Sequence, residues 1–371
     1  MKTVRRLFYV DIVTAVAFVA AAFLSLSFFI DFIDQLGDVG QNGYTMIQAT
    51  LYALLLLPGH FYEVAPIAVL IGTIYTLSRM AQSSEYTILR TGGLGPWRAL
   101  SLLATLGLVF GVLTFVVGDY LAPLSERQAM QVQAMYKGGM KFGRSGAWLK
   151  DHASTPDGER SYSINVGSAG PKALLHDIRI FEFDSDNRLL RRIGAGSAQV
   201  EPNQTWALRD VTVTRWVEAG HGDGKVEVPE EKLATLVWHS NLSAAVVAAA
   251  VSPVSSMSTI DLARYIVHLA DNEQAAQSHR IQFWKRALYP FACLVMVGLA
   301  LPFAYMHARA GGVSLKVFGG IMLGISFVLL NNVAGHLGLL RNWTPWMVAA
   351  APSVLYLLLS LAAFSWLVRY R

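Results

Sequence analysis

Two ionisable side chains stand within a long run of apolar residues, where charged groups are rare. His60 and Glu63 lie between Thr50 and Leu77, and their i, i+3 spacing places them on one face of a helix. Such groups are expensive inside an apolar segment and are therefore candidates for proton relay or for acid–base chemistry on a lipid. The other interpretation is that Glu63 pairs with Arg286, or with a backbone N–H exposed by Pro66, and stabilises a proline kink. A metal site needs more ligands than this pair offers, so we expect none.

A second polar segment, SSEYTILRTGG at residues 83–93, has the composition of a short capped helix. We expect Ser83 or Ser84 to accept a hydrogen bond from the free backbone N–H groups, with Glu85 in the first turn. Arg90 lies in the last turn, and Gly92 is the predicted C-cap. A helix this short is not stable in water by itself. The segment therefore needs a surface to lie on.

Motifs for nucleotide, zinc and serine-hydrolase chemistry are absent from the sequence. There is no G-x-x-x-x-G-K-[ST] loop, no H-E-x-x-H, no cysteine pair and no G-x-S-x-G elbow. The one cysteine, Cys293, lies in an apolar run, and the glycines of GGLGP and of residues 310–312 are typical of helix ends. We therefore expect no ATP site in this chain.

The elements that hold these residues are predicted to be membrane-spanning helices. The chain has 371 residues, of which 54% are hydrophobic and 15% charged, and its mean hydropathy is +0.41. About 20 helical residues cross the roughly 30 Å hydrocarbon core of a bilayer. Six runs qualify, the second of them interrupted by Pro58 and Pro66. They are Ile12 to Ile30, Thr50 to Leu77, Ala99 to Gly118, Ala287 to Met306, Val317 to Gly335 and Trp346 to Leu367.

Lysine and arginine predict the orientation of these spans. They gather at both termini and in residues 78–98 and 307–316, whereas the opposite short loops carry only Arg341. Basic loops stay in the cytoplasm. We therefore expect a multi-pass protein of a bacterial inner membrane with cytoplasmic N- and C-termini. The pI of about 9.2 reflects these anchors, and no nucleic-acid partner is expected.

Between the third and fourth spans the sequence period changes to that of strands. Segments such as SYSINV, DIRIFEF, TWALRD and VTVTRWVE alternate apolar and polar residues between turn signals. Short strands at this spacing predict an antiparallel sandwich or open barrel, and a helix capped by Ser258 should follow it. The fold class is thus membrane α-helical with six transmembrane helices and an inserted periplasmic all-β domain. We expect residues 1–138 to hold three spans and a helix near 83–92, 139–256 the β domain, and 257–371 a linker helix and three spans.

This layout resembles the LptF/LptG permeases of the lipopolysaccharide exporter over essentially the whole chain. The matching landmarks, in chain order, are Phe32-Ile-Asp-Gln-Leu36, Tyr62-Glu63 with Pro66, Ser83-Ser-Glu85, Arg90-Thr-Gly-Gly93, Ala122-Pro123 with Glu126, and Trp148-Leu-Lys-Asp151. The stretches I-D-Q-L and Q-A-M-Y-x-G-G are more similar to the LptG branch, although both branches share every gross feature. The resemblance implies a jellyroll-like β domain.

The resemblance also assigns a role to the polar segment. In that family the helix after the second span is a coupling helix that docks into a separate ATPase subunit, which binds ATP and Mg²⁺. Here the coupling residues would be Ser84, Glu85, Tyr86, Ile88, Leu89 and Arg90. Glu85 would contact a basic groove, and the apolar side chains would supply buried area.

Family mechanism implies a path for the lipid. Two permeases, LptF-like and LptG-like, form a cavity between their first and fifth spans, and lipopolysaccharide enters it sideways from the outer leaflet. The candidate cavity residues here are Phe23, Leu26, Phe28, Phe29, Asp31, Phe32, Phe318, Phe327 and Leu330. The lipid would pass to a single-span LptC-like partner and a soluble LptA-like bridge. The inward residues of a β trough, assigned by alternation, would be Trp148, Tyr162, Ile164 and Val166.

One departure from the family concerns the lipid's phosphates. Many relatives place lysines at the outer end of the first span, where this chain has Asp31, Gly37 and Asp38. Carboxylates repel phosphates unless a divalent cation bridges them. Either Ca²⁺ or Mg²⁺ bridges the lipid phosphates, or Arg127, Lys137 or the partner permease supplies the positive charge. No other cofactor is expected in this chain.

Two other functions are compatible with the sequence. The chain could be a mechanotransmitting subunit of another ABC system, which moves an outer domain without passing a lipid through its spans. It could also be a membrane-embedded lipid-modifying enzyme that uses His60 and Glu63.

Overall fold

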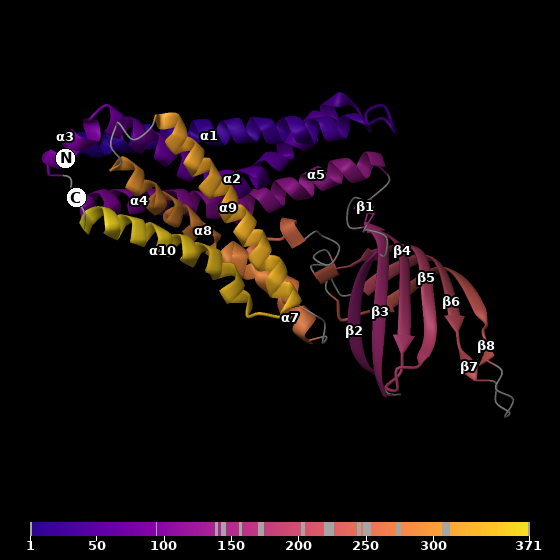
Figure 1. The fold of residues 1–371 in the computed structure, drawn as a ribbon. Coiled ribbons are helices and arrows are strands. Elements are labelled where there is room, and N and C mark those ends of the chain that lie inside the picture. The colour runs from indigo at the N-terminus through magenta and orange to yellow at the C-terminus, as the bar shows by residue number, and fades with distance from the viewer. Residues whose placement is uncertain are drawn as a thin grey trace. The chain divides into compact units, whose positions relative to one another are not determined.

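The computed structural model forms two compact units (Figure 1). Residues 1–35, 53–126 and 277–371 make the helical unit, and residues 36–52 and 127–276 make the β unit. The structure describes residues 2–93, 95–137, 140–141, 146–155, 158–169, 174–201, 205–218, 226–242, 246–247, 254–271, 276–305 and 312–369.

All six predicted spans are helices long and apolar enough to cross a membrane. The second is one unbroken helix of 37 residues that contains both Pro58 and Pro66. Helices α8 and α10 likewise contain prolines. The helices are α1 (Lys2–Leu36), α2 (Met46–Gln82), α3 (Glu85–Thr91), α4 (Pro96–Val116), the π-helical turn η1 (Val117–Leu121), α5 (Ala122–Lys137), the 3-10 turn η3 (Val254–Ser256), α7 (Thr259–Asp271), α8 (Gln277–Ala304), α9 (Val313–Leu340) and α10 (Pro345–Arg369).

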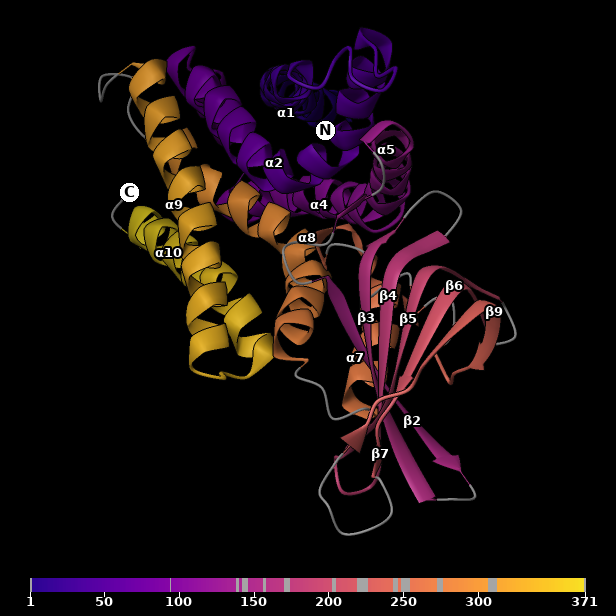
Figure 2. The ribbon, with the colours of Figure 1, turned by 90° about the vertical axis from the view of Figure 1, so that its right-hand side faces the viewer.

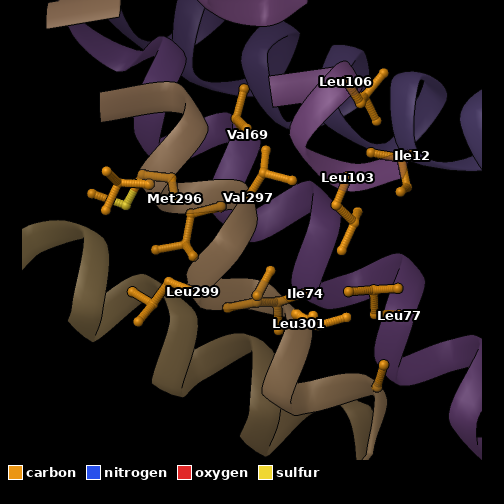
Figure 3. Close-up of a cluster of buried hydrophobic side chains, with 14 of the residues drawn as sticks. Ile12, Val69, Ile74, Leu77, Leu103, Leu106, Met296, Val297, Leu299 and Leu301 are labelled. Carbon is orange, nitrogen blue, oxygen red and sulfur yellow. The ribbon is translucent and has the colours of Figure 1, made fainter. Parts of the chain in front are cut away.

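The core of the helical unit is centred on α8, which packs against α4 and α10. Figure 3 shows side chains of α1, α2, α4 and α8 gathered in one hydrophobic cluster. Glycines let backbones approach closely: a Cβ added to Gly72 of α2 would lie 2.7 Å from the backbone of Val16 in α1. Half of the residues in the most apolar 18-residue segment of α8 are buried, compared with 17% in the corresponding segment of α1 and 22% in that of α9. These two spans therefore bury the least of their surface within this chain.

The third span continues without a break into the polar helix α5. The junction is the π-helical turn η1, a feature that is frequent at functional sites. Gly118 lies in this turn, and a Cβ there would overlap the ring of Tyr62. Its carbonyl oxygen accepts a hydrogen bond of 3.2 Å from Arg286. The wide turn thus brings α2, the third span and α8 together at one point.

The β unit contains an antiparallel sheet in the order β1-β3-β4-β5-β6-β9, with β2 also paired to β3 (Figure 2). The expected inserted all-β region is confirmed. The strands are β1 (Met140–Lys141), β2 (Ala147–Thr155), β3 (Gly158–Ala169), β4 (Leu174–Phe183), β5 (Leu189–Val200), β6 (Thr205–Arg215), β7 (Val217–Glu218), β8 (Val226–Glu227) and β9 (Glu230–His239), of which β7 and β8 form a separate pair.

Three neighbouring strands lose their inside–outside alternation in the same row. Buried residues are separated by three positions at Leu175 and Ile178, at Ala195 and Ala198, and at Leu208 and Val211. The intervening row is occupied by Asp177 in β4, Gly196 in β5 and Asp210 in β6, which lie opposite one another in the strand register.

The strand register is the same on both sides of this row, whereas the buried face changes phase across it. Asp177 and Asp210 have φ of 53° and 54°, a left-handed conformation that Asp tolerates better than most residues. The change of phase in this row explains why the alternation predicts two segments, TWALRD and VTVTRWVE. In the structure residues 205–215 form the single strand β6.

Helix α7 ends the β unit and has the expected cap. The Oγ of Ser258 accepts a hydrogen bond from the backbone N–H of Asp261 at 3.1 Å, and the Asp261 carboxylate pairs with Arg127 of α5. In the same unit Tyr44 packs edge-on against Tyr136 at 5.7 Å.

Candidate functional site

Helix α3 forms where the sequence predicts it, but its beginning differs. Ser84 has φ of 61° and makes no side-chain capping bond. The Ser83 hydroxyl instead donates to the carbonyl of Arg79 in the preceding helix. The predicted serine cap is therefore wrong, because a left-handed residue joins α2 directly to α3 and directs the serine side chains away from the free N–H groups. The end is as expected, with the Gly92 N–H bonded to the Ile88 carbonyl at 2.9 Å.

One face of α3 is fixed to the chain's own core. Tyr86 is 3% exposed and meets Tyr305 edge-on at 5.3 Å between ring centroids. The Arg90 guanidinium lies 5.6 Å from the centre of the same Tyr305 ring, and Leu89 packs against the hydrophobic core. Burial raises the pKa of Tyr86. The predicted role of Tyr86 as a free contact surface is wrong, because this ring anchors the helix.

The other face of α3 is open. Glu85 is exposed, and Ile88 is 67% exposed although it is apolar. An exposed carboxylate next to an exposed aliphatic side chain, on a helix whose opposite face is anchored, is suited to contact with another protein. Of the predicted coupling residues, Ser84, Glu85 and Ile88 are thus accessible, Tyr86 is buried, and Leu89 is partly buried.

His60 has a partner that the sequence did not suggest. Its Nε2 lies 2.7 Å from Oδ2 of Asp31, which joins α2 to α1. The residues are 29 positions apart, and only the hairpin-like course of α1 and α2 brings them together. No periodic signal within either helix reveals this contact. His60, which is predicted for lipid chemistry, and Asp31, which is predicted for the lipid cavity, therefore lie at the same site.

Further polar groups surround Glu63 and Arg286. Glu126 interacts electrostatically with Arg286, Glu63 and His60, and Gly59 leaves room for it, since a Cβ there would lie 2.5 Å from Oε1 of Glu126. The Tyr289 hydroxyl donates to the backbone carbonyl of Glu63 at 2.7 Å.

Arg286 is 7% exposed and has its guanidinium 5.7 Å from the centre of the Tyr62 ring. The pairing of Glu63 with Arg286 stays a prediction. Together, Asp31, His60, Glu63, Glu126 and Arg286 form a polar cluster in the membrane-spanning part of the helical unit.

None of the predicted lipid-cavity residues on α1 is buried within this chain. Among the described side chains of α1 the buried ones are Phe8, Ile12, Val16, Ala20 and Gln35, and no side chain from residue 21 to residue 34 is buried. Phe29 is 62% exposed and Leu26 is 59% exposed. Phe28 and Phe32 stack at 6.1 Å. The second half of α1 thus offers an apolar surface that this chain leaves uncovered.

On α9 the predicted lipid-cavity residues differ in their exposure. Phe318 is 56% exposed, but Phe327 is 3% exposed and lies edge-on against Tyr356 of α10 at 5.2 Å. Phe327 therefore belongs to the core and does not line a cavity, and Leu330 packs partly against the same core. From Val317 to Leu330 every side chain of this span is apolar or small, so hydropathy alone cannot distinguish its inner face from its outer face. The exposed apolar stripe runs through Leu315, Phe318, Met322, Ile325, Leu329 and Val333.

Three of the four predicted trough residues face the interior of the β unit. Tyr162, Ile164 and Val166 are buried, whereas Trp148 is 51% exposed and stacks on Phe181 at 6.1 Å. Its neighbour Leu149 pairs with Ile164 and takes the inward place. The prediction for Trp148 is wrong by one residue, because a one-residue shift in phase exchanges the two faces of a strand.

Comparison with known proteins extends over nearly the whole chain. A sequence model described as lipopolysaccharide export system permease LptF/LptG matches residues 6–367. The chain is 28% identical over 342 residues to the lipopolysaccharide export system permease protein LptG of Escherichia coli strain K12, with 91% of each protein covered. It is 24% identical over 339 residues to the protein of the same name from Haemophilus influenzae, with 91% of this chain and 90% of the relative covered. The chain therefore belongs to the LptF/LptG family of lipopolysaccharide export permeases.

Proposed function

We propose that this chain is a permease subunit that extracts lipopolysaccharide from the outer leaflet of a bacterial inner membrane and passes it to a periplasmic bridge. The observation that carries the proposal is the family match over residues 6–367. It accounts for both the six spans and the inserted β unit. A permease is a transport protein rather than an enzyme, so the chemistry that drives it lies in another chain.

The second half of α1 and the exposed stripe of α9 are the proposed surfaces for the lipid and for a second, LptF-like permease. Both spans bury little of themselves within this chain. In water such surfaces are an aggregation hazard, but in a membrane they meet acyl chains or another helix. The inward side chains of β2 and β3 would continue the path toward LptC-like and LptA-like partners.

Energy would come from an LptB-like ATPase that binds ATP and Mg²⁺ and contacts Glu85 and Ile88 on α3. Tyr86 holds the helix against Tyr305, so a force applied to the exposed face reaches the ends of α2 and α8. This arrangement supports a cytoplasmic position for α3 and for both termini. The β unit would then lie in the periplasm.

Recognition of the lipid phosphates is proposed to use divalent cations or bases from another element. The carboxylate of Asp31 is paired with His60 at 2.7 Å. The exposed carboxylate of Asp34 is therefore the better candidate for binding a Ca²⁺ or Mg²⁺ that bridges to the lipid phosphates. The side chain of Arg127 is 51% exposed, and it is a candidate for the positive charge that binds a lipid phosphate.

The test is reconstitution of the complete complex in proteoliposomes with fluorescent lipopolysaccharide and a soluble acceptor. We expect ATP-dependent transfer to the acceptor, and Glu85→Ala should reduce it on the order of tenfold. Thr87→Ala, an exposed change on the same helix, should leave it intact.

Two results would contradict the proposal. ATP turnover without lipid transfer would favour a mechanotransmitting subunit. Loss of transfer in His60→Ala and Glu63→Gln, with release of a chemically altered lipid by the wild type, would favour an enzyme.

A further inference from the structure

A cavity of about 590 Å³ lies in the helical unit between α1, α2 and α9. Ten residues line it: Asp11, Thr14, Ala15, Phe18, Val19, Ile71, Tyr75, Thr76, Arg79 and Val317. Phe18 is 76% exposed and Tyr75 42% exposed, so the cavity is accessible from the surface. Behind it, α1 and α2 are in tight contact, where Gly72 meets Val16 and the Thr76 hydroxyl reaches the Asp11 carbonyl at 3.3 Å. The hollow is therefore bounded by a well-packed helix pair.

The lining is polar at one end and apolar at the other. Asp11 and Arg79 lie at the same end, since the Thr76 hydroxyl contacts the Asp11 carbonyl and Arg79 follows Thr76 by three residues in α2. Phe18 is seven residues from Asp11, and Ile71 is eight from Arg79, which is about 10 to 12 Å along a helix. One leaflet contributes about 15 Å to the hydrocarbon core of a bilayer. The cavity thus matches in polarity and length a phospholipid head group together with the adjoining part of an acyl chain.

Two opposite charges at the polar end are available for a ligand. In the part of the chain that the structure describes, neither the Asp11 carboxylate nor the Arg79 guanidinium has a hydrogen-bond or ion-pair partner. A guanidinium binds phosphate oxygens through two N–H groups, and a carboxylate accepts hydrogen bonds from an ammonium. A ligand with both groups would satisfy both side chains.

We propose that this cavity binds a phospholipid whose head group carries both a phosphate and a primary ammonium. Arg79 binds the phosphate, Asp11 binds the ammonium, and one acyl chain lies between Phe18, Val19 and Ile71. A head group with phosphate alone leaves Asp11 unsatisfied beside a second negative charge, and a trimethylated nitrogen has no N–H to donate. The site selects for phosphatidylethanolamine over phosphatidylglycerol and phosphatidylcholine.

This site is distinct from the proposed path of the cargo. The exposed cargo-facing residues of α1, such as Leu26 and Phe29, lie further along the helix, toward the opposite face of the membrane. The bound lipid therefore belongs to the leaflet next to α3. Its binding does not depend on the proposed export function and can be measured without transport.

The experiment is native mass spectrometry of the full-length chain after exchange into detergent with equal amounts of the three lipids. We expect the wild type to retain phosphatidylethanolamine about tenfold more than either of the others. Arg79→Gln should lose this retention about tenfold, and Asp11→Asn should abolish the preference among head groups. Arg6→Gln, an exposed charge change on α1 outside the cavity, should behave as the wild type.

A second measurement does not require the charge variants to fold. A benzophenone amino acid replaces Phe18 in the assembled complex, in vesicles with radiolabelled phosphatidylethanolamine. Capture of the labelled lipid supports the site, whereas capture of a second polypeptide identifies the cavity as a subunit interface and overturns the proposal. Equal retention of the three lipids by the wild type, or no effect of Arg79→Gln, overturns it as well.

Discussion

Helix α3 has one face that Tyr86 anchors to the core of the chain and one face that is exposed. Its ring is 3% exposed and packs edge-on against Tyr305, while Glu85 beside it is exposed. A helix of seven residues has little stability of its own. The position of the exposed carboxylate therefore depends on the buried tyrosine more than on the helix itself.

Tyr86→Ala tests this dependence. Removal of a large buried ring should lower the free energy of unfolding by about 3 to 5 kcal/mol and should weaken coupling even though Glu85 is unchanged. Tyr86→Phe keeps the ring contact with Tyr305 and should retain coupling. Thermal unfolding in detergent and ATP-dependent lipid transfer measure the two effects. Normal transfer by a folded Tyr86→Ala protein would contradict an anchoring role.

Alkaline pH provides a second test of the same residue. Burial raises the pKa of Tyr86 above its ordinary value of 10.0. The folded protein then keeps this proton when the unfolded chain has lost it. The stability from the raised pKa is complete below pH about 10 and falls above it. Between pH 8 and 11 the melting temperature of the wild type should fall more steeply than that of Tyr86→Phe, and parallel curves would contradict the assignment.

At the scale of elements, hydropathy was sufficient to predict the six spans, and alternation was sufficient to predict a β domain. The failures have physical causes. The sequence predicts Phe327 in the lipid cavity, whereas it lies in the core, because lipid and protein interior are equally apolar and the sequence of α9 does not distinguish them. The pairing of His60 with Asp31 depends on the packing of α1 against α2, which no local pattern encodes.

The row of Asp177, Gly196 and Asp210 was missed because a phase change resembles the end of a strand. Its energetic role can be measured at Asp210, which has φ of 54°. Asp210→Val places a β-branched residue in a left-handed conformation and should destabilise the sheet by about 1 to 2 kcal/mol. Asp210→Gly should be nearly neutral, and Thr212→Val on the same strand is the control.

Hydrogen exchange of β5 and β6 reports this effect locally. Increased exchange in Asp210→Val alone is the expected result. Equal protection in Asp210→Val and Thr212→Val would show that the left-handed conformation imposes no constraint.

The π-helical turn η1 makes a similar prediction for the helical unit. A methyl group at Gly118 would overlap the Tyr62 ring, whereas Gly319 of α9 has no atom within 4 Å of an added Cβ. Gly118→Ala should therefore lower the free energy of unfolding by about 1 to 3 kcal/mol, and Gly319→Ala should have little effect.

The Tyr62→Ala background is the control for this clash. There, Gly118→Ala should add almost nothing to the loss of stability, since the obstructing ring is gone. Additive losses in the double variant, measured by thermal unfolding in detergent, would assign the role of Gly118 to the conformation of the turn itself.

At the scale of the whole molecule, the chain combines a well-packed centre with two spans that it leaves uncovered. Helix α8 supplies the centre, and α1 and α9 are the least buried of the six spans. A chain that belongs to the LptF/LptG family and leaves these surfaces open is suited to work with a second permease and a lipid. Residues 21–34 of α1, with no buried side chain, are where the proposed cargo path is most exposed.

The most direct measurement is photo-crosslinking in the assembled complex with a benzophenone amino acid at Phe29, 62% exposed, or at Phe327, 3% exposed. We predict a lipopolysaccharide adduct at Phe29 and none at Phe327. An active ATPase complex that yields no lipopolysaccharide adduct at Phe29 would contradict a cargo path along α1.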